Sequence, residues 1–154
     1  MFKKSIMVVL SLSLTGCISS YTPIMPAHAH AFFAGDALCL LTPGRTEKQK
    51  LKGISVTRKG ESPGFSQFFK NQDEYLTVKK DTCIPTLGYK FETGRAYHVS
   101  MHFTPDDERV KSDVSLNTYS ISFVTWETSD KSKEISVFRN DILSIKKSAP
   151  FSAQ

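Results

Sequence analysis

The sequence predicts an all-β fold in which short antiparallel strands form a β-sandwich. From about residue 27 onwards, apolar residues recur at every second position in several short runs, which is the period of a half-buried strand. Beyond the first 16 residues, no run has the 3.6-residue period of an amphipathic helix. Gly, Pro, Asp and Asn separate the runs at intervals of roughly 8–12 residues, a spacing typical of sandwiches.

Short segments in the first half of this region are expected to form strands. Gly35-Asp36 indicates a turn between the first two, and Pro43 ends the second because proline cannot donate to a strand ladder. The fourth segment, which contains three phenylalanines, fits either a strand or one helical turn. The segments are residues 28–33, 37–41, 54–58, 65–69 and 75–79.

The clearest alternation lies at residues 97–103. Its apolar residues fall on one face of a strand and its polar residues on the other: Tyr97, Val99, Met101 and Phe103 against His98, Ser100 and His102. Tyr97 also follows a turn at Gly94, and this arrangement resembles the tyrosine corner of immunoglobulin-like sandwiches, whose hydroxyl bonds back to the upstream backbone. We therefore expect an immunoglobulin-like antiparallel β-sandwich.

The last third of the sequence predicts three further strands and a frayed end. Residues 117–127 form the longest alternating run, and turns at residues 129–132 and 140–141 separate it from strands at residues 135–138 and 142–145. The sandwich domain is expected to span residues 27–147, and residues 148–154 are expected to fray.

The first 20 residues contain the parts of a secretory signal peptide. Lys3 and Lys4 form a positive head, and the apolar run at residues 6–14 is shorter than the roughly 20 residues that span a bilayer. The following Leu-Thr-Gly-Cys resembles a bacterial lipobox, in which cleavage after Gly16 leaves Cys17 as the lipid-bearing first residue. A buried cysteine in a first helix is the alternative.

These features place the mature protein outside the cytoplasm. We expect a signal peptide at residues 1–16 and a lipidated tether at residues 17–26, because two prolines and small polar residues favour an extended chain. Bacterial lipoproteins kept in the inner membrane usually carry Asp after the lipidated cysteine, and this chain has Ile18. The predicted location is the periplasm, anchored through Cys17, with the outer membrane favoured over the inner.

A disulfide between Cys39 and Cys83 is expected. The chain has three cysteines, and lipidation of Cys17 leaves two in a compartment where disulfides persist. Closing a loop of roughly 45 residues would stabilise the fold by about 4 kcal/mol, according to the chain-entropy estimate. Two free buried thiols are the alternative, since no second pair exists to complete a zinc site.

Charge and motif content argue against nucleic-acid binding and catalysis. Loss of Lys3 and Lys4 lowers the formal net charge from +5 to +3, and no basic block with interleaved aromatic residues remains. No serine lies in a Gly-x-Ser-x-Gly motif, and the acidic run at residues 106–108 fits a solvated loop. We therefore expect no catalytic residues, no cofactor and no enzymatic activity.

Four histidines are weak candidates for a metal site. His28 and His30 are two residues apart, and His98 and His102 are four apart, so each pair shares one face of an expected strand. If these strands were neighbours, the four imidazoles could bind zinc or copper. No carboxylate or thiolate has ligand spacing around them, so solvent-facing histidines without a metal are the prediction.

Three segments resemble a family of small enterobacterial lipoproteins described as type VI secretion immunity periplasmic lipoproteins. They are residues 37–43, residues 54–56 and residues 83–97, of which Cys-Ile-Pro-Thr-Leu-Gly-Tyr-Lys-Phe from Cys83 is the most specific. The resemblance covers residues 37–103 and the lipobox; the later strands rest on their pattern alone. It implies a periplasmic protein that binds and occludes an incoming toxin.

The functional expectation is therefore a lipid-anchored protein that binds a protein partner. The loops at residues 46–52, 60–64 and 104–113 are the candidate contact elements. The alternatives are a structural or accessory lipoprotein of the cell envelope, and a periplasmic metal-binding lipoprotein.

Overall fold

The computed structural model describes residues 25–106, 114–139 and 142–144, and confirms the all-β fold class. The strands are β1 (Met25–His28), β2 (His30–Ala34), β3 (Ala37–Leu41), β4 (Leu51–Arg58), β5 (Phe65–Phe68), β6 (Ala96–Phe103), β7 (Val114–Glu127), β8 (Lys133–Arg139) and β9 (Ile142–Ser144). One short 3-10 helix, η1 (Gln72–Glu74), follows β5. None of the described residues belongs to a helix long and apolar enough to cross a membrane.

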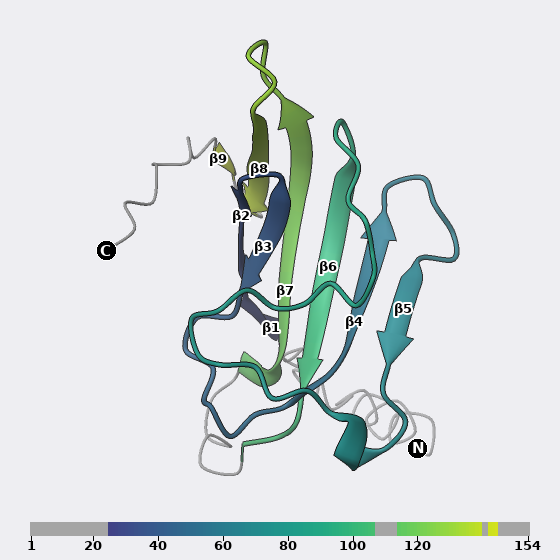
Figure 1. The fold of residues 1–154 in the computed structure, drawn as a ribbon, viewed down its shortest axis with the longest axis vertical. Coiled ribbons are helices and arrows are strands. Elements are labelled where there is room, and N and C mark those ends of the chain that lie inside the picture. The colour runs from purple at the N-terminus through teal and green to yellow at the C-terminus, as the bar shows by residue number, and fades with distance from the viewer. Residues whose placement is uncertain (1–24, 107–113, 140–141, 145–154) are drawn as a thin grey trace, which may run out of the picture.

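Seven of the described strands form one sheet in the order β5-β4-β6-β7-β8-β9, with β1 also paired to β7 (Figure 1). The long strand β7 pairs with β6 along one edge, while β1 and β8 share its other edge. β1 pairs with β7 as far as Ser120, and β8 pairs with it from Ser122 onwards. The hairpin of β2 and β3 forms a second, two-stranded sheet.

The strand expected at residues 28–33 is two strands in two different sheets. His28 ends β1 and His30 begins β2, while Ala29 between them is buried and donates its N–H to the Ser120 carbonyl at 3.0 Å. β1 runs parallel to β7, so one strand pair departs from the antiparallel arrangement expected. The expected tether also ends inside β1, and its earlier residues and the signal peptide lie outside the described ranges.

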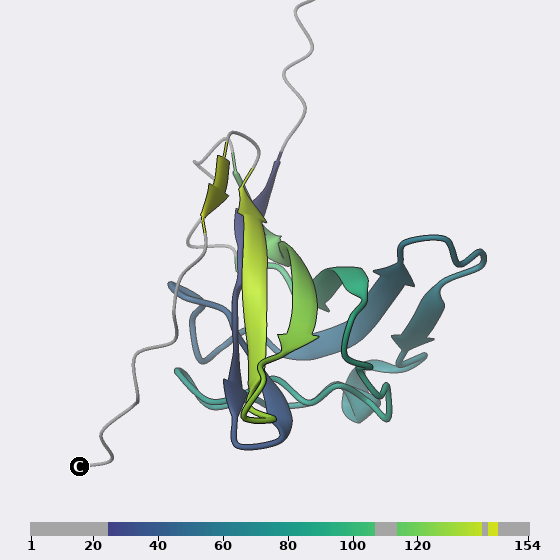
Figure 2. The same cartoon turned by 90° about the horizontal axis from the view of Figure 1, so that it is seen from above.

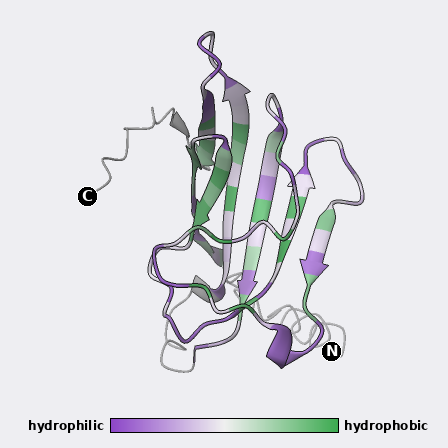
Figure 3. Ribbon diagram, in the orientation of Figure 1, coloured by the Kyte–Doolittle hydropathy of each residue, from purple (hydrophilic) through white to green (hydrophobic). Residues whose placement is uncertain are grey.

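The core lies between the large sheet and a cover on one of its faces. The β2-β3 hairpin and the long connection from β5 to β6 lie in front of the sheet in Figure 1, and Figure 2 shows the same layers from above. Hydrophobic and hydrophilic colours alternate along β6 and β7, as the sequence predicted (Figure 3). The sheet contributes Leu51, Ile54, Val56, Tyr97, Val99, Met101, Phe103, Tyr119, Ile121 and Phe123 to the core, and the cover contributes Leu40, Val78 and Ile84.

The disulfide between Cys39 and Cys83 is confirmed, and it ties the two parts of the cover together. Next to it, the Ile84 N–H donates to the Leu40 carbonyl at 2.8 Å. Leu40 and Ile84 both belong to the core, so the bond holds the long connection against the buried side of the hairpin.

The strand expected at residues 75–79 does not form. Leu76 makes one isolated bridge to Leu51, and the carbonyls of Val78 and Lys79 accept hydrogen bonds from the side chain of Arg45. A buried arginine therefore satisfies backbone groups that a neighbouring strand would otherwise pair. The turn expected at residues 140–141 and the frayed end at residues 148–154 lie outside the described ranges.

Candidate binding surfaces

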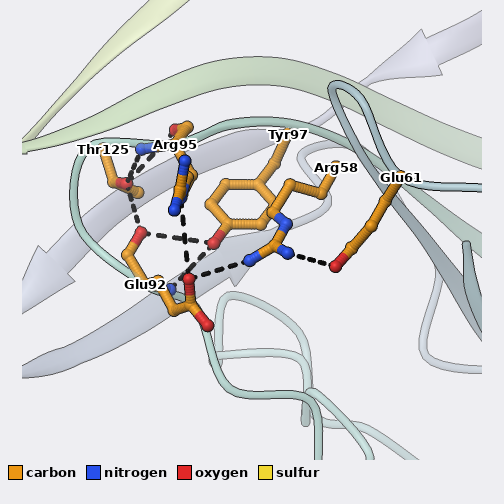
Figure 4. Close-up of polar contacts among 6 residues, drawn as sticks. All are labelled: Arg58, Glu61, Glu92, Arg95, Tyr97 and Thr125. Carbon is orange, nitrogen blue, oxygen red and sulfur yellow. Dashed lines mark hydrogen bonds and ion pairs between the residues drawn. The ribbon is translucent and has the colours of Figure 1, made fainter.

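At one end of the sheet, Tyr97 forms the tyrosine corner that the sequence predicted. Its hydroxyl accepts the N–H of Glu92 at 2.8 Å and donates to the Glu92 carbonyl at 3.2 Å (Figure 4). The Thr125 hydroxyl donates to the same carbonyl at 2.6 Å. Because Tyr97 and Thr125 are both buried, these bonds fix the backbone of the loop that precedes β6.

A small cluster of charged side chains lies beside the fixed loop. The Glu92 carboxylate pairs with Arg58 at 2.8 Å and with Arg95 at 3.7 Å, and Arg58 also pairs with Glu61 (Figure 4). Burial lowers the pKa of Arg58, but the carboxylates of Glu61 and Glu92 outweigh this effect and raise it overall. Ion pairs that are largely open to solvent add little stability.

At the opposite end, the buried guanidinium of Arg45 organises the loop between β3 and β4. Its Nη2 donates to the carbonyls of Val78 and Lys79 at 2.7 and 2.9 Å, and its Nη1 donates to the Gln49 carbonyl at 3.1 Å. The Phe103 ring lies 5.2 Å from the guanidinium carbon. Burial lowers the pKa of Arg45, and the nearby Tyr119, Glu47 and Asp81 offset this effect only in part.

This end joins two of the three loops proposed as contact elements. The Thr46 hydroxyl donates to the Asp106 carboxylate at 2.6 Å, and the Lys50 N–H donates to the Thr104 hydroxyl at 3.0 Å. The loop at residues 60–64 lies at the other end of the sheet, beside the Glu92 cluster. Asp106 is thus part of a hydrogen-bonded loop contact, and residues 107–113 lie outside the described ranges.

The face of the large sheet that points away from the cover carries hydroxyl and imidazole groups. Strand register places residues of β4, β6 and β7 side by side on it. We call this surface the outer sheet face; it comprises Ser55, Thr57, His98, Ser100, His102, Thr118, Ser120 and Ser122. Phe68, Trp126 and Phe138 lie beside it, with 45%, 36% and 40% of their surface exposed.

The ring of His98 links two serines on the outer sheet face. Its Nδ1 lies 2.8 Å from the Ser122 Oγ, and its Nε2 lies 3.2 Å from the Ser100 Oγ. A nucleophilic serine would also need donors aimed at the oxyanion of its substrate. On a sheet face the backbone N–H groups lie in the plane of the sheet and pair with neighbouring strands. His98 and the two serines thus form one hydrogen-bonded row across β6 and β7.

The structure does not bring the four candidate histidines together. His98 and His102 belong to the outer sheet face, and His28 in β1 lies in register with Ser120 of that face. However, β7 separates β1 from β6, and His30 belongs to the β2-β3 hairpin. Within the described ranges, no three His, Cys, Asp or Glu side chains are grouped so that they could hold a metal ion.

His102 sits under an aromatic ring that crosses from the edge strand. The Phe68 ring lies 5.1 Å from the His102 ring and passes over Gly53, where a Cβ atom would lie 2.5 Å from the Phe68 ring. Burial lowers the pKa of His102, and Lys52 lowers it further. Gly53 is therefore required for this packing, which holds Phe68 against the sheet.

The sequence predicted loops as contact elements and did not predict the outer sheet face or which strand lies at the end of the sheet. The alternation of Ser and His with apolar residues at 97–103 and 118–124 was the available signal for the face. No local pattern indicates which strand ends a sheet, because that depends on long-range pairing.

Comparison with known proteins gives a family but no described activity. No curated protein and no solved structure matches the chain. The family described as a domain of unknown function (DUF7480) matches residues 26–136, from β1 into β8. Because this match covers more than half of the sequence, the chain belongs to the DUF7480 family.

Proposed function

We propose that the mature protein is a lipid-anchored periplasmic binding protein, and that it acts as an immunity factor by occluding a toxin delivered through type VI secretion. The resemblance at residues 37–43, 54–56 and 83–97 supplies the immunity hypothesis. The protein would act by binding, with no catalytic step of its own.

The observation that carries the binding role is the uncovered outer sheet face. One face of the large sheet is buried under the hairpin and the long connection, while the other has no covering element among the described residues. Phe68, Trp126 and Phe138 expose aromatic surface beside its hydroxyl groups. Aromatic residues are enriched in the central parts of protein interfaces, and charged residues are depleted there.

The cysteine pairing supports the lipid anchor. The chain has three cysteines, and the fold uses Cys39 and Cys83 in one disulfide, which leaves Cys17 for modification. Because β1 begins at Met25, only a short segment would separate the lipid from the sheet and keep the binding surfaces close to the membrane.

The proposal is tested in cells that meet a competitor carrying a type VI secretion system. A strain lacking the protein should lose viability beside the competitor, and the wild-type gene should restore it. A Cys17→Ser variant should appear in the soluble periplasmic fraction instead of the membrane fraction. Equal survival of the deletion strain and its parent would contradict immunity, and recovery of an envelope assembly component as the bound partner would favour an accessory role.

A further inference from the structure

Strand β5 leaves one edge of the large sheet unpaired. It pairs with β4 on one side, and Figure 1 places it at the end of the sheet with no described strand beyond it. The Phe69 N–H donates to the Lys52 carbonyl at 2.9 Å, and the register pairs Gln67 with Ile54. Since hydrogen-bonding direction alternates along an antiparallel strand, the N–H and C=O groups of Ser66 and Phe68 point away from β4.

The free edge is limited at both ends by residues that offer no free N–H group. At one end, the Lys70 N–H donates to the Glu74 carboxylate at 3.2 Å, and the Asn71 side chain holds the same carboxylate at 2.8 Å. At the other end, Pro63 has no N–H to donate. The edge can therefore pair with one extended segment of only a few residues.

Two other strand edges in the described structure are covered. The start of β4 is bridged by Leu76, whose N–H donates to the Leu51 carbonyl at 3.1 Å. The edge of β3 receives the Ile84 N–H at the Leu40 carbonyl. No described residue covers β5 in this way, so its outward donors and acceptors stay available to another chain.

The side chains of β5 favour pairing with another strand. Natural edge strands are commonly protected by Lys, Pro or inward-pointing charges, and the β5 sequence Phe-Ser-Gln-Phe has none of these. Phe68 lies on the outer side against His102, and Phe65 lies on the inner side with its ring 5.1 Å from Tyr89. An added strand would thus find apolar surface above and below its backbone.

We propose that the free edge of β5 binds an extended, uncharged segment of the protein partner as an added strand of the sheet. This inference rests on the proposed protein-binding function and assigns the place and the form of recognition. Main-chain hydrogen bonds to Ser66 and Phe68 supply affinity, and alternate side chains of the segment contact Phe68 or Phe65. Two copies paired through this four-residue edge would form one continuous sheet whose outer faces do not meet, so they would bury far less than the roughly 1,200 Å² of a stable interface. A segment of a different protein can be followed by further contacts of that protein with the adjoining outer sheet face, which favours a partner segment.

The test uses a displayed library of random linear peptides selected against the full-length protein. Enriched peptides are then bound to the wild-type protein and to two edge variants. Ser66→Pro removes the outward N–H and leaves the hydrogen bonds to β4 in place, because proline is tolerated where the N–H faces solvent. Phe68→Lys places a charge on the edge, and Ser66→Ala is the matched control that keeps every backbone donor.

We expect the peptides to slow hydrogen exchange at the Ser66 and Phe68 amides and to bind Ser66→Pro and Phe68→Lys at least about tenfold more weakly, a loss of about 1.4 kcal/mol. Ser66→Ala should bind as the wild type does. Unchanged binding to both edge variants, protection elsewhere on the sheet, or a failure to enrich any peptide would overturn the inference. A concentration-dependent dimer that Ser66→Pro abolishes would also overturn it, because the occupant would be a second copy. Thermal unfolding of each variant shows that the domain is intact.

The cellular assay separates this inference from the proposed function. If Ser66→Pro and Phe68→Lys protect cells as fully as the wild type does, immunity stands and the β5 edge is not the binding place. If the deletion strain survives as well as its parent while peptides still dock on β5, the edge inference stands and the immunity proposal fails.

Discussion

The hydroxyl of Tyr97 satisfies both backbone polar groups of Glu92, which lies five residues before it in the chain. One side chain thereby fixes the loop that leads into β6 and that holds the Glu92 carboxylate beside Arg58 and Arg95. Tyr97 is 3% exposed, so water cannot readily replace its hydroxyl.

A Tyr97→Phe substitution should therefore lower the free energy of unfolding by about 1–3 kcal/mol, because it leaves a partly buried N–H without its partner. Urea unfolding monitored by tryptophan fluorescence measures the loss. Tyr89→Phe is the matched control, since Tyr89 stacks in the same aromatic cluster but its hydroxyl makes no hydrogen bond to a described residue. Equal effects of the two substitutions would contradict the corner's role.

Replacement of Arg45 by Lys should lower the free energy of unfolding by about 2–4 kcal/mol, although the charge is kept. The planar guanidinium reaches the carbonyls of Gln49, Val78 and Lys79 together, and a lysine ammonium cannot span that set. Arg95→Lys, at a side chain that is 57% exposed, should change stability by less than about 0.5 kcal/mol in the same urea titration. A stable Arg45→Lys protein would show that residues 78–79 are held by something else.

Removal of the disulfide by a Cys39→Ala and Cys83→Ala double substitution should lower the free energy of unfolding by about 4 kcal/mol, because the bond closes a loop across 44 positions. Dithiothreitol should destabilise the wild type by a similar amount and leave the double variant unchanged. Calorimetry with and without the reductant makes the comparison. An equal response of both proteins to dithiothreitol would show that the reductant acts at another place.

His102 should make stability depend on pH in the range below its ordinary pKa. Burial and Lys52 lower the pKa of His102 in the folded protein, so the unfolded chain takes up a proton first as the pH falls. The contribution of a neutral His102 is therefore complete above about pH 6.5, the unfolded value, and is lost as the pH falls through the lowered folded value. His102→Gln, which cannot titrate, should lose less stability than the wild type between pH 7.5 and pH 5.5 in urea titrations. Parallel pH profiles of the two proteins would refute the assignment.

The parts of the fold that follow from local pattern were predictable from sequence. Alternation identified β6 and β7 and their buried faces, the Gly94-to-Tyr97 pattern predicted the hydroxyl bond to the backbone, and the cysteine count predicted the pair Cys39 and Cys83. The first two inferences depend on residues that are close in sequence. The third depends on only two remaining cysteines, which allow a single pairing.

The parts that depend on distant pairing were not predictable. The segment at residues 28–33 has the composition of a single strand. It is divided at Ala29 because the part before Ala29 pairs with β7 and the part after it pairs with β3. Residues 75–79 have strand-like composition, but Arg45 binds the carbonyls that a strand would pair. The free edge of β5 is a property of sheet order, which no local signal carries.

The parallel pairing of β1 with β7 sets an order of assembly for the chain. Met25 is synthesised long before Val114, its partner in the register, so the first strand to emerge is among the last to find its place. Contacts between residues so far apart in sequence are slow to form because a long loop must close first. A chain threaded through a membrane from its N-terminus would thus pair β1 fully only after residue 120 has crossed, and a truncation before that point would leave β1 without the strand that it needs.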